Sequence, residues 1–156
     1  MQSYFPFFVN IDQKKILVYG AGKIAGRRIA GVLRFGASVV VKAPQIQKGI
    51  WELQKNYAHR LFIEQRPYQY DEIQKKDADL VLAATDDKQI NERISIECRR
   101  KGIPVNNASD SSQCDFYFPA FVERDGLLIA VISTDGNHKK VAEFSAKLRM
   151  EDDMGK

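Results

Sequence analysis

One short segment limits the fold of this chain more than any other feature. An apolar run at residues 15–19 leads directly into Gly20, Gly22 and Ala25, and apolar side chains then recur at helical spacing to about residue 35. Glycines at these positions permit a tight turn between a strand and a helix and let the main chain approach a pyrophosphate. The helix amino terminus adds free N–H groups and a favourable dipole. The pattern predicts a dinucleotide site, the alternative being a turn that serves only the fold.

Beyond this turn, buried strands and helices continue to alternate up to about residue 112. The predicted strands are 38–41, 60–64, 80–84 and 104–107, and the predicted helices are 51–57, 70–76 and a segment that Asp86 caps and Gly102 ends. Strands that alternate with helices form parallel sheets with helices on both faces. The sequence therefore predicts an α/β, doubly wound, Rossmann-like dinucleotide-binding domain over residues 1–112.

The pattern changes over residues 113–156. Apolar runs at 116–122 and 127–133 flank the turn residues 123–126, which predicts a β-hairpin, and an amphipathic helix follows over about 139–150. A lone hairpin with one helix buries too little apolar surface to be stable by itself. We therefore expect this segment to pack on the first domain or on a second subunit, as a dimerisation segment.

The composition excludes several classes of protein. The chain has 156 residues with 44% hydrophobic content, which is normal for a globular protein. No apolar run approaches the roughly 20 residues that cross a bilayer, and the first residues lack the basic start of a signal peptide. With only two cysteines and no zinc-site spacing, a reduced, cytoplasmic protein without a metal site is expected. The net charge of +4 comes without the dense basic patch of a nucleic-acid binder, and it suits an anionic small molecule.

Polar residues follow two of the predicted strands, where dinucleotides bind. The strand 38–41 ends in Lys42 instead of the acid that usually holds the ribose hydroxyls. We interpret Lys42 either as a partner of a 2′-phosphate, which would favour NADP, or as a solvated lysine. Thr85 and Asp86 follow the strand at 80–84, so they are candidates for cofactor or substrate contacts, although Asp86 also suits a helix N-cap.

Two later polar segments are candidates for chemistry. Residues 106–112 follow the next strand and contain Asp110 as their only carboxylate, which makes Asp110 a candidate proton acceptor near a nicotinamide. A plain turn rich in Asn and Ser is the alternative. Residues 133–139 join the hairpin to the last helix and include His138 and Lys139, which are cationic groups suited to an anionic ligand.

Four segments of the chain together resemble a known family. They are residues 4–8 (Tyr-Phe-Pro-Phe-Phe), the Gly20–Ala25 turn, residues 83–87 (Ala-Ala-Thr-Asp-Asp) with Asn91, and residues 106–119 leading to 133–136 (Ser-Thr-Asp-Gly). In this order they are similar to the precorrin-2 dehydrogenase/sirohydrochlorin ferrochelatase family, the non-methylating part of sirohaem synthase. The resemblance spans residues 4 to about 149, and residues 83–87 combined with the late hairpin are its most specific part.

The resemblance implies an activity and a set of contacts. It implies oxidation of precorrin-2 to sirohydrochlorin, with NAD as the hydride acceptor even though the ribose acid is missing. It further implies a homodimer whose subunits exchange contacts through the hairpin and helix. The implied cofactor contacts are Gly20, Gly22, Lys23, Ile24, Pro44, Gln45, Thr85 and Asp86. The implied contacts to a tetrapyrrole substrate with many carboxylates are Asn106, Arg124, His138 and Lys139.

This sequence departs from the family pattern in three ways, the first of which concerns the bifunctional members. Those members carry an Asp where this chain has Ser109, with Asp110 one step later. Either Asp110 substitutes as the base, or the proton passes to water and only iron insertion is lost, so Ser109 and Asp110 are the catalytic candidates. Gly136 to Lys139 replace a Gly-x-Ser-Pro sequence, and members usually continue into a further helical region past the position of Lys156.

Two other functions stay open from the sequence. One is a non-catalytic module that senses a dinucleotide and reports its occupancy to a partner. The other is a tetrapyrrole-binding protein that passes an intermediate to another enzyme without using NAD. Turnover of precorrin-2 separates both from the dehydrogenase.

Overall fold

The computed structural model, which describes residues 4–150, divides the chain into two units. The larger unit is Val9–Tyr117, and the smaller unit joins residues 4–8 to residues 118–150. The boundary falls later than residue 112 because the segment after that residue still bonds to the last strand of the larger unit. Asp115 N donates to Val105 O at 2.9 Å, and Asn106 Nδ2 donates to Phe116 O at 2.7 Å.

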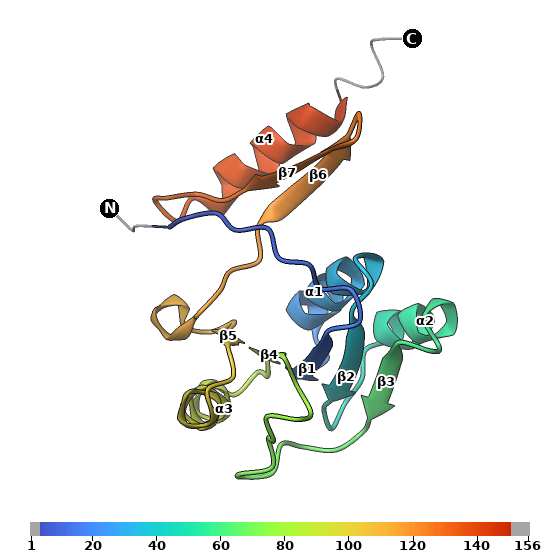
Figure 1. Ribbon diagram of the computed structural model, residues 1–156, viewed down its shortest axis with the longest axis vertical. Coiled ribbons are helices and arrows are strands. Elements are labelled where there is room, and N and C mark those ends of the chain that lie inside the picture. The colour runs from blue at the N-terminus through green and yellow to red at the C-terminus, as the bar shows by residue number, and fades with distance from the viewer. Residues whose placement is uncertain (1–3, 151–156) are drawn as a thin grey trace. The chain divides into compact units, whose positions relative to one another are not determined.

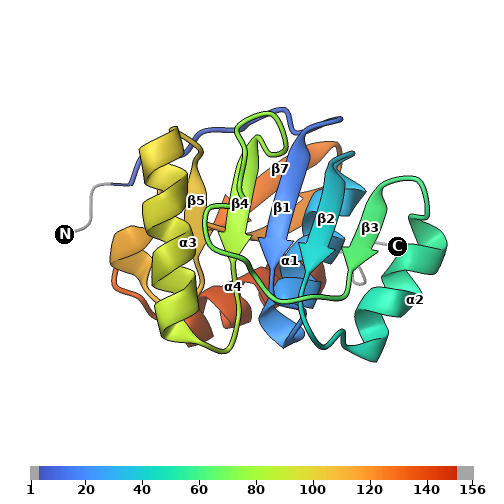
Figure 2. The same ribbon diagram turned by 90° about the horizontal axis from the view of Figure 1, so that it is seen from below.

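The larger unit is an all-parallel sheet with helices on both faces. In chain order its elements are β1 (Lys15–Tyr19), α1 (Lys23–Arg34), β2 (Ser38–Lys42), α2 (Lys48–Asn56), β3 (Leu61–Glu64), β4 (Leu80–Ala83), α3 (Lys88–Lys101), β5 (Val105–Asn107) and the 3-10 turn η1 (Ser111–Gln113). The strand order is β3-β2-β1-β4-β5, and Figure 2 shows α3 on the face opposite α1. The predicted α/β, doubly wound sheet is confirmed.

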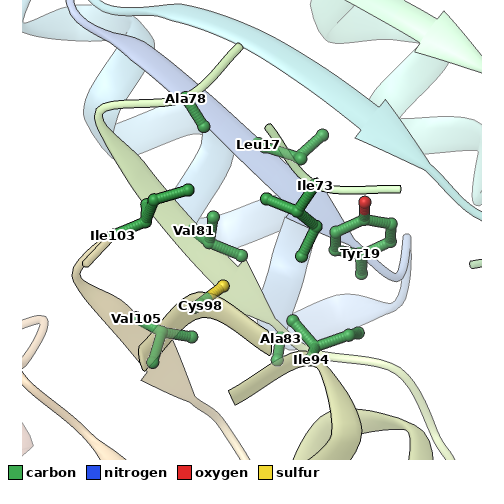
Figure 3. Close-up of a cluster of buried hydrophobic side chains, with 10 residues drawn as sticks. All are labelled: Leu17, Tyr19, Ile73, Ala78, Val81, Ala83, Ile94, Cys98, Ile103 and Val105. Carbon is green, nitrogen blue, oxygen red and sulfur yellow. The ribbon is translucent and has the colours of Figure 1, made fainter. Parts of the chain in front are cut away.

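Side-chain alternation along β1 divides its residues between the two faces of the sheet. Leu17 and Tyr19 pack with Ile94 and Cys98 of α3 in one buried cluster, which is drawn in Figure 3. Ile16 and Val18 point to the opposite face, because successive side chains of a strand alternate. The strands β1 and β4 are buried on both sides, which explains why their sequences read as continuous apolar runs.

The helix predicted over residues 70–76 is wrong, because these residues form turns. Asp71 has a φ of +60°, which no α-helix accommodates, and Glu97 of α3 captures the main chain beside it. The buried Glu97 carboxylate accepts from Ile73 N at 2.7 Å and from Lys101 Nζ at 2.8 Å. An irregular segment bound to α3 therefore takes the place of a helix between β3 and β4.

The predicted N-cap of α3 is also corrected by one residue. The Asp87 side chain, not Asp86, accepts from Gln89 N at 2.8 Å and from Ile90 N at 3.2 Å. The helix begins at Lys88, so Asp87 occupies the position from which a short acid reaches the first free N–H groups. Asp86 is exposed and not committed to this cap.

The smaller unit is the predicted hairpin with one helix. It contains β6 (Ala120–Arg124), β7 (Leu127–Val131) and α4 (His138–Met150), and Figure 1 shows α4 lying along the hairpin. Asp125 and Gly126 both have positive φ, as the two-residue turn of a tight hairpin requires. Asn137 caps α4 by accepting from Lys140 N at 2.9 Å.

Within residues 4–150, no helix is both long enough and apolar enough to cross a bilayer.

Candidate functional site

Three strands bring the candidate residues to one edge of the sheet. β1 pairs in parallel with β4, and β4 pairs in parallel with β5. Their carboxyl ends therefore lie at the same edge, where ligands bind in open α/β sheets. Gly20, Thr85 and Ser109 follow these three ends.

Gly20 is required by the fold itself. Its φ is +104°, and a Cβ at this position would lie 2.1 Å from Ala84 O and 2.8 Å from Thr85 N. Gly20 N also donates to Lys42 O at 3.0 Å, which ties the turn to β2. Only a residue without a side chain allows β1 and the segment after β4 to approach this closely.

Gly22 is not required by the fold, and it lies where a phosphate would bind. Its φ is −82°, and a Cβ added there would meet nothing within 4 Å. Gly22 is the N-cap of α1, without a capping side chain, and the first turn of α1 carries no acidic residue. Lys23 and Ile24 are exposed in that first turn. Open space above uncapped N–H groups fits an anionic phosphate, so this turn fits the predicted dinucleotide.

The segment after β2 lies beside the glycine turn. Gln47 N is 3.4 Å from Ala21 O, and this hydrogen bond joins the two loops. Pro44 and Gln45 are exposed in the same segment, and Pro44 O accepts from Gln65 Nε2 at 3.2 Å. The structure therefore places Pro44 and Gln45 near the turn, as the predicted cofactor contacts require.

Lys42 is not solvated, so that interpretation of this residue is wrong, and its side chain is paired with glutamates instead of being directed to an open site for a 2′-phosphate. Its side chain is only 13% exposed, and Nζ lies 3.4 Å from a Glu72 carboxylate oxygen and 3.7 Å from one of Glu64. It also lies 5.9 Å from the centre of the Tyr19 ring. Lys42 and Arg66 together balance the charges of these two carboxylates beside the sheet.

Thr85 is held by a buried amide from α3. Asn91 is fully buried, and its Oδ1 accepts from Thr85 N at 3.0 Å and from Thr85 Oγ1 at 2.7 Å. Its Nδ2 donates to Thr85 O at 3.1 Å. Both main-chain groups of Thr85 are thus fixed, and with them the segment that packs against Gly20.

The same Asn91 side chain reaches Ser109. Nδ2 donates to Ser109 Oγ at 3.1 Å. Ser109 N and Ser109 Oγ lie 2.9 Å and 2.7 Å from Oδ1 of the buried Asn107. Asn91 therefore links the ends of β4 and β5, and it brings Thr85 and Ser109 into one hydrogen-bonded group.

The Asp110 carboxylate forms a local turn. Its Oδ1 accepts from Ser112 N at 2.9 Å and from Ser112 Oγ at 2.7 Å, so Asp110 caps η1. The hydrogen bonds from Ser112 hold the pKa of Asp110 below its usual value. A carboxylate stabilised in this way is a weaker base than a free aspartate.

Asn106 is buried with both ends of its amide engaged. Oδ1 accepts from Arg28 Nη1 at 2.7 Å, and Nδ2 donates to Phe116 O. The first of these hydrogen bonds holds the Arg28 guanidinium against β5, where burial lowers its pKa. Asn106 would have to break these bonds in order to contact a substrate.

The remaining predicted substrate contacts lie on the smaller unit, at opposite ends of α4. Arg124 Nη1 donates to Leu148 O at 3.5 Å, near the end of the helix. His138 and Lys139 begin the same helix, about 15 Å earlier at 1.5 Å per residue. Lys139 is highly exposed, with Glu143 3.9 Å away. The smaller unit does not gather these three side chains into one cluster.

A separate groove lies on the face of the sheet that carries α3. It is lined by Leu17, Val40 and Phe62, with charged groups that include Lys15 and Glu72. It lacks the glycine turn and the uncapped helix terminus, so it does not match the predicted phosphate site.

The cysteines and potential metal ligands do not mark a second chemical site. Burial raises the pKa of Cys98 to about 12, so this thiol is not a reactive thiolate at neutral pH. Among the residues that the structure describes, no three His, Cys, Asp or Glu side chains are grouped to hold a metal ion.

The sequence interpretation missed Asn91 and Asn107 as members of this group. A signal was present for Asn91, because Asn91, Ile94, Ser95 and Cys98 recur at the spacing of one helix face. A polar residue on the buried face of a helix must satisfy its hydrogen bonds inside the protein. Nothing comparable distinguished Asn107 from its neighbours in a polar segment.

Comparison with known proteins gives a family match and several relatives. The model of a family described as putative NAD(P)-binding matches residues 7–120. A probable multifunctional siroheme biosynthesis protein of Ruminiclostridium josui is 36% identical over 93% of this chain and 28% of its own length. A siroheme synthase of Nitrosospira multiformis is 34% identical over 84% of this chain and 28% of its own length. This chain thus spans little more than a quarter of these relatives.

A solved structure described as a precorrin-2 dehydrogenase is similar over most of the chain. Its TM-score is 0.73 at 26% identity, and the match covers 95% of this chain and 71% of that one. Together with the family match, this confirms the predicted Rossmann-like fold, the family resemblance and the nicotinamide cofactor.

The two glycines of the turn should respond differently to the same substitution. We expect Gly20→Ala to lower the free energy of unfolding by about 2 kcal/mol or more, because the methyl group meets a carbonyl at positive φ. Gly22→Ala should lower it by less, at most about 1 kcal/mol, because the site is open and only the preference of an N-cap for glycine over alanine is lost. Urea unfolding measures both, and equal losses would contradict the assignment of the two roles.

Proposed function

We propose a function for this chain from the premise that it belongs to the putative NAD(P)-binding family, whose model matches residues 7–120. The function is NAD-dependent oxidation of precorrin-2 to sirohydrochlorin in siroheme biosynthesis. The observation that carries it is the open, uncapped helix terminus at Gly22, placed at the same sheet edge as Thr85 and Ser109. The names of the relatives, siroheme proteins and a precorrin-2 dehydrogenase, support the choice of substrate.

The residues of the turn would hold the dinucleotide. The N–H groups at Gly22, Lys23 and Ile24 would bind the pyrophosphate, and Gly20 keeps the turn close to Thr85. The other proposed contacts are Pro44, Gln45, Thr85 and Asp86. When bound, NAD supplies the acceptor for the hydride that leaves the macrocycle.

Oxidation of precorrin-2 also releases a proton, which needs an acceptor. Ser109 is a poor base, because its hydroxyl already lies in hydrogen-bond contact with two buried amides. Asp110 is committed to Ser112, which lowers its pKa. We therefore assign the proton to water at this edge, with Asp110 as the residue that shapes the adjacent turn. Insertion of iron is not part of this proposal.

The substrate carries many carboxylates, and basic and hydrogen-bonding side chains of the smaller unit suit them. We propose Arg124 at one end of α4, and His138 and Lys139 at the other, as contacts to different carboxylates. Asn106 would serve by holding Arg28 rather than by touching the substrate.

We also propose a homodimer formed through the smaller unit. β6 and β7 pair only with each other in the described sheet, so both are edge strands. Apolar side chains are exposed on the same unit, namely Leu127, Leu128, Ile132 and Phe144. Covering these side chains and edges with a second copy would stabilise a unit too small to stand alone. The free thiols of Cys98 and Cys114 agree with a reducing, cytoplasmic location.

Turnover tests the proposed activity directly. Mixing the protein with precorrin-2 and NAD should produce NADH absorbance in step with sirohydrochlorin. Gly22→Asp should abolish NAD binding in calorimetry and turnover in the assay, because its carboxylate would meet the pyrophosphate. Gly22→Ala is the control for folding. NAD binding without any NADH formation would favour a dinucleotide sensor instead.

The role of Asp110 is tested by its removal. We expect Asp110→Ala to keep most of the dehydrogenase rate, because water takes the proton. Loss of a general base would lower the rate by about a hundredfold or more. Ser112→Ala, which disturbs the same turn but keeps the carboxylate, is the matched control. A large loss in Asp110→Ala alone would restore Asp110 as the base.

The dimer is tested by sedimentation. The unaltered chain should sediment as a dimer, and Leu127→Glu should shift it to the monomer, since a charge would be placed in the interface. The substitution is tolerable within one copy, because Leu127 pairs across the hairpin with Arg124. Ile96→Glu, at an exposed apolar position of α3, should leave the dimer intact. A monomeric unaltered chain would refute this part of the proposal.

A further inference from the structure

The amide of Asn91 has a determined orientation. It is fully buried, its Oδ1 faces Thr85 N at 3.0 Å, and its Nδ2 faces Thr85 O at 3.1 Å. A main-chain N–H can only donate and a main-chain carbonyl can only accept, so these two contacts identify which end is oxygen. The second Nδ2 proton is therefore the one directed at Ser109 Oγ, 3.1 Å away.

Asn107 fixes the hydroxyl of Ser109 from the other side. Its Oδ1 accepts from Ser109 N at 2.9 Å, so the oxygen end of this amide faces Ser109. The same Oδ1 lies 2.7 Å from Ser109 Oγ, and in that pair only the hydroxyl can donate. A hydroxyl has one proton and two acceptor positions, and in Ser109 the proton goes to Asn107 while one acceptor position receives Asn91. One acceptor position is left, and Ser109 is exposed.

We propose that Ser109 is a hydrogen-bond acceptor for an N–H donor of the bound ligand, and that Asn91 and Asn107 are positioning residues that fix this polarity. The inference rests on the proposed function, which supplies two such donors: the carboxamide of the nicotinamide and the pyrrole N–H groups of the tetrapyrrole. A hydroxyl held in this way does not donate to a ligand carbonyl or carboxylate. Ser109 thus selects for a donor at this position.

The location of Ser109 supports a ligand contact. Ser109 follows β5, and the Asn91 side chain forms hydrogen bonds both to Ser109 and to Thr85. The main chain of Thr85 in turn lies so close to Gly20 that a Cβ on Gly20 would clash with it. A continuous chain of contacts therefore runs from the phosphate-binding turn to the Ser109 hydroxyl. Each buried amide must have its hydrogen-bonding groups satisfied inside the protein. The placement of two such amides around one exposed serine supports a ligand contact at Ser109.

The test removes the acceptor and, separately, the donor. Affinities are measured by calorimetry for NAD and for its 3-acetylpyridine analogue, in which a methyl group replaces the amide nitrogen and its protons. If the donor is the carboxamide, Ser109→Ala weakens NAD binding about threefold to tenfold, the usual effect of one hydrogen bond, and leaves the analogue unchanged. Ser109→Thr, which keeps a hydroxyl, should restore NAD affinity.

If the donor is a pyrrole N–H, the effect moves to the other ligand. Ser109→Ala then leaves both dinucleotide affinities unchanged and weakens the binding of precorrin-2 by a similar factor, with rescue again by Ser109→Thr. Unchanged affinity for NAD and for precorrin-2 in Ser109→Ala would overturn the inference. Equal weakening of NAD and its analogue, with precorrin-2 binding intact, would also overturn it.

The positioning role has its own readout. Asn91→Ala should weaken the same ligand as Ser109→Ala does, and add little to it in the double variant, whereas a general loss of packing weakens NAD and its analogue equally. Should Asn91→Ala fail to fold, the Ser109 variants still decide the inference. Because binding needs no turnover, unaltered protein that binds both ligands without forming NADH refutes the dehydrogenase and leaves this inference standing.

Discussion

The close packing of Gly20 against the main chain of Ala84 and Thr85 is the contact on which the site depends. It sets the distance between the turn after β1 and the segment after β4, which are neighbours in the parallel sheet. Asn91 then connects the segment after β4 to the segment after β5, because its side chain forms hydrogen bonds to Thr85 and to Ser109. One steric requirement and one buried amide thus align the ends of three strands.

The two glycines of the turn have different roles, since Gly20 serves the stability of the fold and Gly22 is assigned to ligand binding. Gly20 has positive φ and no room for a side chain, whereas Gly22 has ordinary backbone geometry and open space. The empty region above Gly22, with uncapped N–H groups beneath it, therefore supports ligand binding independently of any sequence comparison.

The sequence predicted the sheet well because buried parallel strands are continuous apolar runs, as in β1 and β4. It failed over residues 70–76, where a long-range contact decided the structure: Glu97 binds Ile73 N from α3, and Asp71 takes a positive φ. Local pattern carries no information about a partner more than twenty residues away. Lys42 was misjudged for the same reason, since Glu72 reaches it only in the folded chain.

The candidate site was predicted in part. The glycine turn and Thr85 follow from the strand-turn-helix pattern, which is local. The polarity of Ser109 does not, because it depends on the orientation of two buried amides, Asn91 and Asn107, that only the folded structure brings to it. The capping role of Asp110 lies between these cases, since a short acid before a turn is a recognisable local signal.

The central claim is that the dinucleotide binds at the carboxyl edge of β1, β4 and β5. Backbone amide NMR shifts on titration with NAD test it most directly. The account predicts the largest changes at Gly22 to Ile24, at Thr85 and at Ser109, with little change along the groove at Val40 and Phe62. Shifts concentrated at Val40 and Phe62, with the amides of the glycine turn unmoved, would contradict it.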